Sequence, residues 1–505
     1  MSCASVSLDT ETLDTETLDT ETLDTETLDT ETLDTETLDA GTPMNPNDIL
    51  AKAETLRNDL SSGFRDEMVK SLYTEAERIA RRAVRIAQDK KYDLDQKIDR
   101  LVTSPLTGLP IMLALLAVLI WLTVSGANVV SDAIAGVLFW VGDQGTALFQ
   151  ALHLPWWLTG FVWNGVYRGL AWVVSVMLPP MAIFFPAFTI LEDLGYLPRV
   201  AFNLDWLYRK AGAHGKQSLT MAMGFGCNAA GVVSTRIIDS PRERLIAILT
   251  NNFVPCNGRF PTLIMLATVF VAASFPPALT SIIAAGAVVG VVLIGVAFTF
   301  FMSWLLSNTI LRGEASAFTL ELPPYRRPNV GRILYTSLID RTLFVLWRAI
   351  QTAAPAGAVI WILANIPFGE ANLAHAIADW LNPFGLLLGL DGVILLAYII
   401  AIPANEIVVP TMMMVYMGAG MMIQGPATNA AIYDLLVNGH GWTMLTAVNL
   451  MLFALLHNPC ATAITTIYKE TKSWKWATLS VVITLGTAIL VTFLTASVAR
   501  LLGWA

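Results

Sequence analysis

Three of the four cysteines in this sequence lie beside helix-breaking or amide residues within apolar stretches. Cys227 stands between a glycine and an asparagine, and Cys256 and Cys460 each directly follow a proline. Polar side chains in such stretches are costly to bury and usually serve a function. Thiolates are ligands for the softer transition metals, and carboxylate or amide oxygens extend the range toward harder ions. The pattern therefore predicts a mixed sulfur and oxygen site for a divalent transition metal.

Four further polar residues complete the candidate ligand set. The full set of candidate metal ligands is Cys227, Cys256, Cys460, Glu192, Asn228, Glu406 and Asn458. Such a site suits ferrous iron and its neighbours, and it lacks the aromatic walls that a nucleoside or a sugar needs. Two other interpretations stay open at this point. A buried cysteine is often only a small hydrophobic residue, and Glu192 and Glu406 could be structural charges.

The candidate ligands recur in a duplicated pattern. Asn252 to Cys256 and Asn458 to Cys460 both place asparagine and Pro-Cys at the end of an apolar segment. Each is preceded by a partner segment, Gly-Cys-Asn at 226–228 or Asn-Glu at 405–406. Paired broken helices in two halves of a membrane protein point to a binding site near the bilayer midplane. We therefore expect two repeats of discontinuous helices.

The composition indicates which elements must position these residues. Of the 505 residues, 55% are hydrophobic and 14% are charged, against roughly 25% charged in soluble domains. The stretches 110–124 and 260–311 contain no charged residue, and about 20 residues of helix cross a bilayer core. The sequence predicts an all-α polytopic membrane protein with eight to ten transmembrane helices. It excludes a nucleic-acid binder, a secreted disulfide scaffold and a soluble dinucleotide-binding enzyme.

The distribution of charge predicts the orientation. Basic residues are frequent from Lys52 to Arg100, and six arginines lie between 311 and 348. Short loops rich in Lys and Arg stay in the cytoplasm, so both stretches and the N-terminus are expected there. No signal peptide is visible. The expected spans begin near residues 109, 163, 261, 279, 344, 392, 442 and 477.

The N-terminal region differs in kind from the rest. Residues 8–37 are six copies of Leu-Asp-Thr-Glu-Thr, a period that fits neither a helix face nor a strand. Residues 1–43 carry 13 acidic and no basic residues, which leaves 31 basic and 27 acidic residues elsewhere. We expect a disordered acidic tail over 1–43. Apolar residues at helical spacing predict an amphipathic cytoplasmic segment over 44–100.

Several motifs, in a fixed order from about residue 95 to the end, resemble those of one family. They are Asp-Arg at 99–100, Leu-Glu-Asp-Leu-Gly-Tyr at 191–196, Gly-Phe-Gly-Cys-Asn at 224–228, Arg-Glu-Arg-Leu at 242–245, Glu-Leu-Pro-Pro-Tyr-Arg at 321–326 and Lys-Glu-Thr-Lys-Ser-Trp-Lys-Trp-Ala at 469–477. This series is similar to the membrane part of the FeoB family of bacterial ferrous iron transporters, with its two Gate segments. The resemblance implies ferrous iron as the transported substrate, the bacterial inner membrane as the location, and the Gate cysteines in the path.

The family normally also has an N-terminal GTP-binding domain. No Gly-x-x-x-x-Gly-Lys-Ser/Thr phosphate loop occurs in the 505 residues. We therefore expect no GTP site, no enzymatic activity and no permanently bound cofactor in this chain. By resemblance, the partners would be the lipid bilayer, a separate GTP-binding protein and a small accessory protein, and the oligomeric state is left open.

Other functions remain as alternatives. They are transport of another divalent metal or of a nucleoside, and a non-transporting subunit of a split system. A Cys460–His457 nucleophile and base is disfavoured because the two lie on one proline-broken segment without an oxyanion arrangement. The expected divisions are a tail (1–43), an amphipathic segment (44–100), a first membrane half with one Gate (101–310), a cytoplasmic loop (311–348) and a second half with the other Gate (349–505).

Overall fold

The computed structural model describes residues 64–83, 90–104, 106–313, 325–368, 371–420 and 429–503. The chain divides into two compact units, Met1–Ala80 and Arg81–Ala505. Helix α2 (Phe64–Ala83) supplies the described residues of the first unit, and its side chains Met68, Leu72 and Ile79 are exposed. The expected acidic tail, and the amphipathic segment as far as residue 63, lie outside the described residues.

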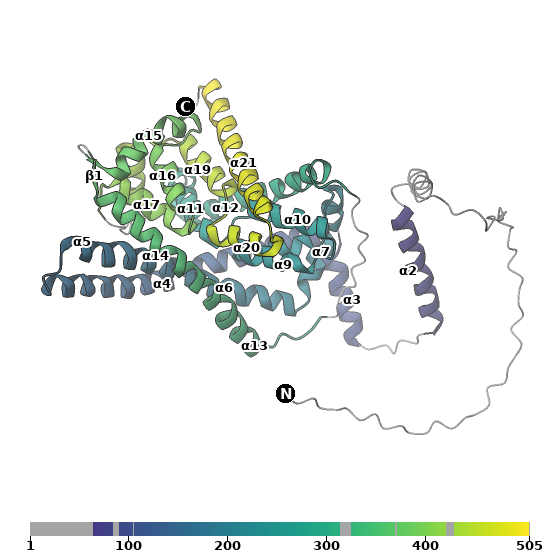
Figure 1. Cartoon of the computed structure of the whole chain (residues 1–505). Helices are drawn as coiled ribbons and strands as arrows, with labels where there is room; N and C mark the ends of the chain where they lie inside the picture. Colours follow the sequence, from purple (N-terminus) through teal and green to yellow (C-terminus); the bar gives the residue numbers. More distant parts are fainter. Residues whose placement is uncertain are drawn as a thin grey trace, which may run out of the picture. The chain divides into compact units, whose positions relative to one another are not determined.

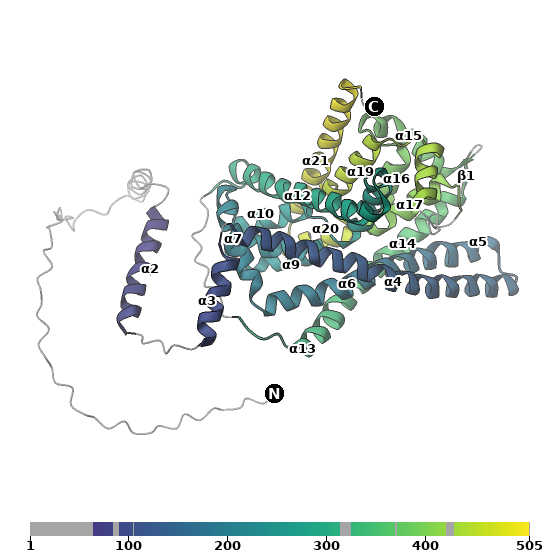
Figure 2. The same cartoon turned by 180° about the vertical axis from the view of Figure 1, so that it is seen from behind.

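The second compact unit is built from helices (Figure 1). Its first half contains α3 (Lys90–Val102), α4 (Gly108–Ala151), α5 (Trp156–Thr159), the π-helical η1 (Gly160–Tyr167), α6 (Arg168–Asp193) and α7 (Tyr196–Lys210). Helix α4 has 44 residues, about 66 Å at 1.5 Å per residue. It packs along α6, as Figures 1 and 2 both show.

The next helices form the centre of the first membrane half. They are α8 (Gln217–Gly226), α9 (Asn228–Ser234), η2 (Thr235–Ile237), α10 (Pro241–Thr250), η3 (Asn251–Phe253), η4 (Asn257–Arg259), α11 (Phe260–Leu266), η5 (Ala267–Val271), η6 (Ala272–Ser274) and α12 (Pro277–Asn308). Residues 241–271 together are long and apolar enough to cross a membrane, although 251–259 interrupt the α-helix.

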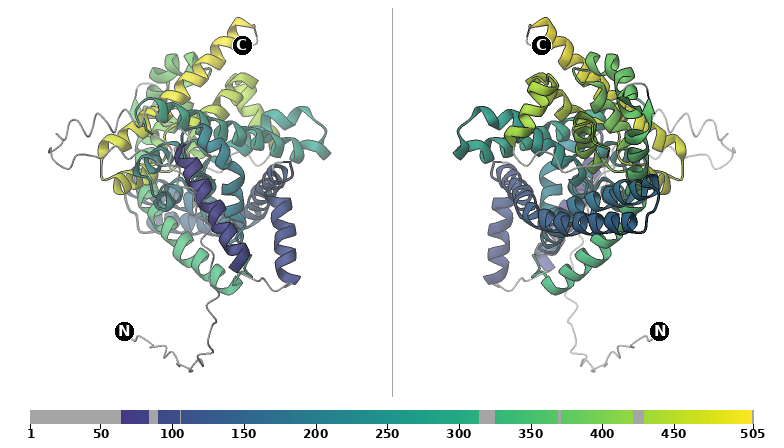
Figure 3. Two further views of the ribbon diagram at one scale, coloured as in Figure 1. Left: turned by 90° about the vertical axis from the view of Figure 1, so that its right-hand side faces the viewer. Right: turned by 90° about the vertical axis from the view of Figure 1, so that its left-hand side faces the viewer.

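The second half repeats this plan. Its elements are α13 (Val330–Tyr335), η7 (Thr336–Leu343), α14 (Phe344–Asn365), β1 (Pro367–Phe368), β2 (Ala371–Asn372), α15 (Leu373–Leu387), α16 (Gly392–Ile400), η8 (Asn405–Ile407), α17 (Val408–Tyr416), α18 (Asn429–Tyr433), η9 (Asp434–Gly439), α19 (Met444–Leu456), α20 (Ala461–Thr471) and α21 (Trp474–Leu501). Helix α21 continues past its neighbours toward the C-terminus, in yellow in both views of Figure 3. The two-residue strands pair antiparallel.

The prediction of an all-α, multi-pass membrane protein is confirmed. Among the described residues, five helical stretches are long and apolar enough to cross a bilayer, and six if the pair α15–α16, bent by 109°, forms one span. Shorter apolar helices lie within α4 and α14. The total of eight to ten crossings therefore stays a prediction. The expected loop 311–348 needs a correction, because the chain is helical from Val330 onward.

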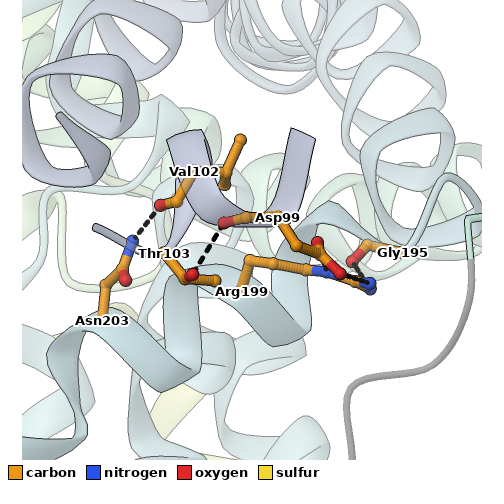
Figure 4. A network of polar contacts seen from close by, with 6 residues as sticks. All are labelled: Asp99, Val102, Thr103, Gly195, Arg199 and Asn203. Carbon is orange, nitrogen blue, oxygen red and sulfur yellow. Dashed lines mark hydrogen bonds and ion pairs between the residues drawn. The ribbon is translucent and has the colours of Figure 1, made fainter. Parts of the chain in front are cut away.

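A polar junction fastens α3 to the first membrane half (Figure 4). Arg199 of α7 is 1% exposed and donates from Nε and Nη2 to both carboxylate oxygens of Asp99, at 3.0 and 3.2 Å. Its Nη1 donates to the carbonyl of Gly195 at 2.8 Å. The ring of Tyr325 lies 4.3 Å from the guanidinium, and burial raises the pKa of Tyr325 to about 12. Residues from three motifs far apart in the sequence thus meet at one arginine.

Helices α8 and α9 form a hairpin that does not cross the membrane, here called the first hairpin (217–234). The helices pack against each other on either side of Cys227. Just outside their ends, Lys216 Nζ lies 2.9 Å from Asp239 Oδ2. The chain therefore enters and leaves at the same side. A re-entrant backbone of this kind is tolerated at membrane depth because surrounding protein buries it.

Helices α16 and α17 form the second hairpin (392–416). Its ends meet where the Tyr416 hydroxyl donates to Asp391, the N-cap residue of α16. Trp442 Nε1 closes this base by donating to Asp391 Oδ2 at 3.2 Å and to the Tyr416 hydroxyl at 3.1 Å.

The two hairpins enter from opposite sides of the membrane. The span 444–471 begins beside Trp442, at the base of the second hairpin. It ends at Glu470, which pairs with Arg236 just after the first hairpin, at 2.7 Å. The two bases therefore lie at opposite ends of one span, and the hairpin tips point toward each other. This is the arrangement of an inverted repeat.

Candidate functional site

A small cavity lies where the two hairpin tips meet, and we call it the thiol cavity. Its lining residues are Met177, Gly226, Cys227, Asn228, Cys256, Asn257, Gly258, Thr352, Pro403, Ala404, Asn405, Glu406, Cys460 and Thr462. Its volume is about 40 Å³, and one water needs roughly 10–15 Å³. The cavity can therefore hold an ion with few waters, and it is too small for a nucleoside.

The broken helices on the two sides of the cavity have matching backbones. Cys227 has φ −155° and ψ 123°, and Ala404 has φ −153° and ψ 115°. An asparagine follows each of them and begins the next helical segment. Cys256 and Cys460 are likewise extended, with ψ of 170° and 159°, and each precedes a helix. The duplication expected from the sequence is present in the backbone.

Each of the three thiols stands at the start of a helical segment. Cys227 precedes α9, Cys256 precedes η4 and Cys460 precedes the eleven-residue helix α20. The N-terminus of a helix carries partial positive charge and stabilises an anion there. A thiolate at Cys460, the form that binds metals, would therefore face the partial positive charge at the start of α20.

Glu406 faces the thiols from the second hairpin. Its side chain is 9% exposed and rests on the backbone of Gly258, where any Cβ would overlap Glu406 Oε1. Trp172 Nε1 donates to the Glu406 carbonyl at 3.2 Å. The carboxylate from one repeat therefore lies in direct contact with the broken span of the other.

Asparagine side chains lie at both helix breaks and contact polar groups there. With its amide nitrogen facing the main chain, Asn228 donates to the carbonyls of Gly224 and Val254, at 3.1 and 3.2 Å. Asn405 Oδ1 lies 3.3 Å from His457 Nε2, and His457 Nδ1 lies 3.0 Å from the Ala454 carbonyl. These amides satisfy backbone or ring groups that the broken helices leave without a partner.

Two of the seven predicted ligands lie elsewhere. Glu192 is exposed near the end of α6, about 22 Å along the helix axis from Met177 at 1.5 Å per residue. Our expectation that it lies near the thiols is therefore corrected. Asn458 lines a separate, apolar cavity with Tyr398 and Phe453. The proline that follows it turns the chain so that Cys460, not Asn458, faces the thiol cavity.

The thiol cavity is not a closed metal site. Across the described ranges, no three His, Cys, Asp or Glu side chains lie close enough together to hold one ion. Cys227, Cys256, Cys460 and Glu406 line the same space from four segments without converging on one point. Such an arrangement suits brief contacts with one or two donors at a time, which a transport path requires.

Sequence reasoning missed the residue that joins the two repeats, Arg259. It is 1% exposed, and its guanidinium donates to the carbonyls of Asn252, Leu455 and His457 at 2.9, 2.7 and 2.8 Å. A lone arginine in an otherwise apolar stretch is the signal that could have found it.

Comparisons with known proteins agree with this architecture. The family model described as "Nucleoside recognition", Gate, matches residues 174–270 and 346–474, and that of "Ferrous iron transport protein B C terminus" matches 288–340. The first model thus matches both repeats. Fold and site define a multi-pass helical membrane protein with two Gate units of broken helices around one small polar cavity.

The chain is similar to curated relatives over most of its length. A "Fe(2+) transporter FeoB" of Staphylococcus aureus (strain MSSA476) is 28% identical over 421 residues, which are 81% of this chain and 59% of that protein. One of Legionella pneumophila (strain Paris) is 30% identical over 355 residues, 67% of this chain and 46% of that protein. No solved structure matches. The chain belongs to the FeoB family and corresponds to its membrane part.

Proposed function

We propose that this chain carries ferrous iron across the bacterial inner membrane, with the thiol cavity as the midpoint of the path. The observation that carries the proposal is that donors from both Gate units line one cavity large enough only for an ion. One thiolate and one carboxylate together carry two negative charges, which offset the charge of a dehydrated divalent ion in a medium of low dielectric. The ion is cargo, so no cofactor is held permanently.

The distribution of charge supports the orientation. Lys216, Arg236, Arg242 and Arg244 cluster near the base of the first hairpin, whereas Asp391 and Asp434 lie near the second. By the positive-inside rule, the first base and the N-terminus face the cytoplasm. Iron would then enter past the second hairpin and leave past the first.

A separate GTP-binding protein and a small accessory protein are part of this proposal. The relatives are named Fe(2+) transporters, and this chain spans 59% of the length of one and 46% of another. The test is uptake of radiolabelled Fe²⁺ by a transport-deficient strain that expresses this chain, with and without a GTP-binding partner. Uptake only with the partner supports a split system, whereas no uptake in either strain contradicts transport by this chain.

Transport of another divalent metal is the alternative function that the donor set allows, because sulfur and oxygen ligands also bind the transition metals next to iron. Competition of Fe²⁺ uptake by Mn²⁺, Co²⁺ and Zn²⁺ decides between them. A nucleoside is disfavoured by the size of the cavity, although the Gate family is described as "Nucleoside recognition".

A further inference from the structure

Four polar side chains of the first Gate unit are buried outside the lining of the thiol cavity. Gln217, Thr250, Asn251 and Asn252 are each no more than 2% exposed. Gln217 Nε2 donates to Thr250 Oγ1 at 2.7 Å and to Ser303 Oγ at 3.2 Å. We call these four residues the amide row.

The amide row contains oxygens that accept no hydrogen bond. Gln217 Oε1, Asn251 Oδ1 and Asn252 Oδ1 are buried without a partner among the described residues. Such a group is destabilising if it stays unpaired, and most native buried polar atoms are paired. Three unpaired acceptors in one Gate unit therefore call for a ligand that this conformation does not hold.

The second Gate unit serves as an internal control. Counted back from the matching breaks at Ala404 and Cys460, the positions equivalent to the row are Ile394, Ala454, Leu455 and Leu456. All four are buried and apolar. The same backbone plan is thus built without polar groups at these positions, so the fold alone does not require the amide row.

The row leads from the thiol cavity to the base of the first hairpin. Asn251 Nδ2 donates at 3.1 Å to the carbonyl of Asn228, a residue that lines the cavity. Gln217 follows Lys216 at the hairpin base, and it lies about 15 Å along the helix from Cys227 at 1.5 Å per residue. The unpaired oxygens of Asn251 and Gln217 therefore lie between the cavity and the base of the first hairpin.

We propose that the amide row is the release path for the cation, an inference that rests on the proposed function. Amide oxygens are harder ligands than thiolates and resemble the water that the ion rejoins. An ion leaving the thiols would contact Asn251 Oδ1 and then Gln217 Oε1 in succession. The apolar equivalents in the second unit offer no such ligands, so the path is polar on one side only.

The path is closed in this conformation. Asn251 fills the space between the two arms of the first hairpin, where a Cβ at Gly224 or Gly231 would lie 2.8 or 2.7 Å from its Oδ1. Release therefore requires the arms of the first hairpin to separate. The two glycines allow the arms to close on the asparagine afterwards.

The test replaces row residues by those of the second unit or by apolar residues of similar length. Asn251→Leu and Gln217→Met each remove one oxygen, and Thr299→Val is a matched buried polar control on α12. Two quantities are measured in the full chain: uptake of radiolabelled Fe²⁺ by cells, and the thiolate-to-Co²⁺ absorption of purified protein loaded with Co²⁺. Melting temperature in detergent checks the fold.

We expect Asn251→Leu and Gln217→Met to lower uptake about tenfold, the effect of losing one contact to a charged group, and to keep the Co²⁺ absorption. Thr299→Val, which removes a buried hydroxyl outside the row, should stay within about twofold of wild type. If Asn251→Leu does not fold, the comparison of Gln217→Met with Thr299→Val decides the matter. Wild-type uptake in Gln217→Met, or joint loss of uptake and Co²⁺ absorption, overturns the release path. No uptake by the wild type removes the proposed function itself.

Discussion

Arg259 of the first Gate unit donates a hydrogen bond from Nη2 to the backbone carbonyl of His457 in the second, over 2.8 Å. Nη1 donates to Leu455 at 2.7 Å and to Asn252 at 2.9 Å. The last carbonyls of a helix have no hydrogen-bond partner within it, and they attract a cation. Here the arginine of the opposite repeat supplies both the hydrogen-bond donors and the positive charge. The two repeats are therefore joined beside the thiol cavity by one buried charge.

Replacing Arg259 by methionine should destabilise the protein strongly. Three backbone carbonyls would lose their donor in a buried place, and each costs about 1–3 kcal/mol when unpaired. We expect a markedly lower melting temperature in detergent. Arg312→Met is the control, since Arg312 is exposed and donates to one carbonyl, that of Asn308. Equal melting temperatures for the two variants would contradict the joining role.

Gly258→Ala should impair transport because the new methyl group overlaps Glu406 Oε1. Overpacking of this kind costs about 1–3 kcal/mol, and it would push the carboxylate away from the thiols. The measurement is Fe²⁺ uptake at equal expression. Gly286→Ala is the control, because nothing lies within 4 Å of a Cβ there. Normal uptake in Gly258→Ala would show that the contact with Glu406 is dispensable.

Serine at Cys227, Cys256 or Cys460 should lower Fe²⁺ uptake, since a hydroxyl is a harder and far less acidic ligand than a thiol. We expect uptake to fall about tenfold in Cys227→Ser. Substitution of residues that only hydrogen-bond to a metal ligand already has an effect of this size. Cys3→Ser is the control. If all three variants keep wild-type uptake, the cysteines are packing residues, and the path must be sought at Asn228, Asn405 and Glu406.

Asp99→Asn should loosen the attachment of α3. It leaves Arg199, which is 1% exposed, without its carboxylate partner, and Asp99 itself is partly exposed. We expect a loss of about 2 kcal/mol, less than the 3–5 of a fully buried pair, seen as a lower melting temperature. Glu75→Gln, in an exposed pair with Arg78, should leave the melting temperature unchanged, because exposed ion pairs contribute little to stability.

The two hairpin bases should be labelled from opposite sides of the membrane. Asp239→Cys near the first base and Asn438→Cys near the second, each in a Cys3→Ser background, are both exposed positions. A membrane-impermeant maleimide applied to intact spheroplasts should label only the cysteine at 438. Labelling of both cysteines, or of neither, would contradict the inverted arrangement, and the unmodified background serves as the control.

Much of the architecture could be predicted from the sequence because bilayer insertion depends on local properties. Length and hydropathy mark the apolar spans. A glycine or proline beside a cysteine marks a break in the helix, whatever the tertiary contacts of that segment are. The breaks at Cys227, Cys256 and Cys460, and their duplication, were therefore readable without a structure. The motif order from residue 95 onward likewise indicated the family.

What the sequence could not determine are the contacts between segments far apart in the chain. Glu192 and Asn458 have ligand-type side chains in suggestive motifs. Yet Glu192 lies at the far end of α6 from the thiol cavity, and the turn at Pro459 directs Asn458 into a separate cavity. Arg259 reaches His457, and Glu406 reaches Gly258, only because two hairpins entering from opposite sides meet at their tips. Local sequence sets where a helix breaks, but the packing of one repeat against the other decides which side chains share a cavity.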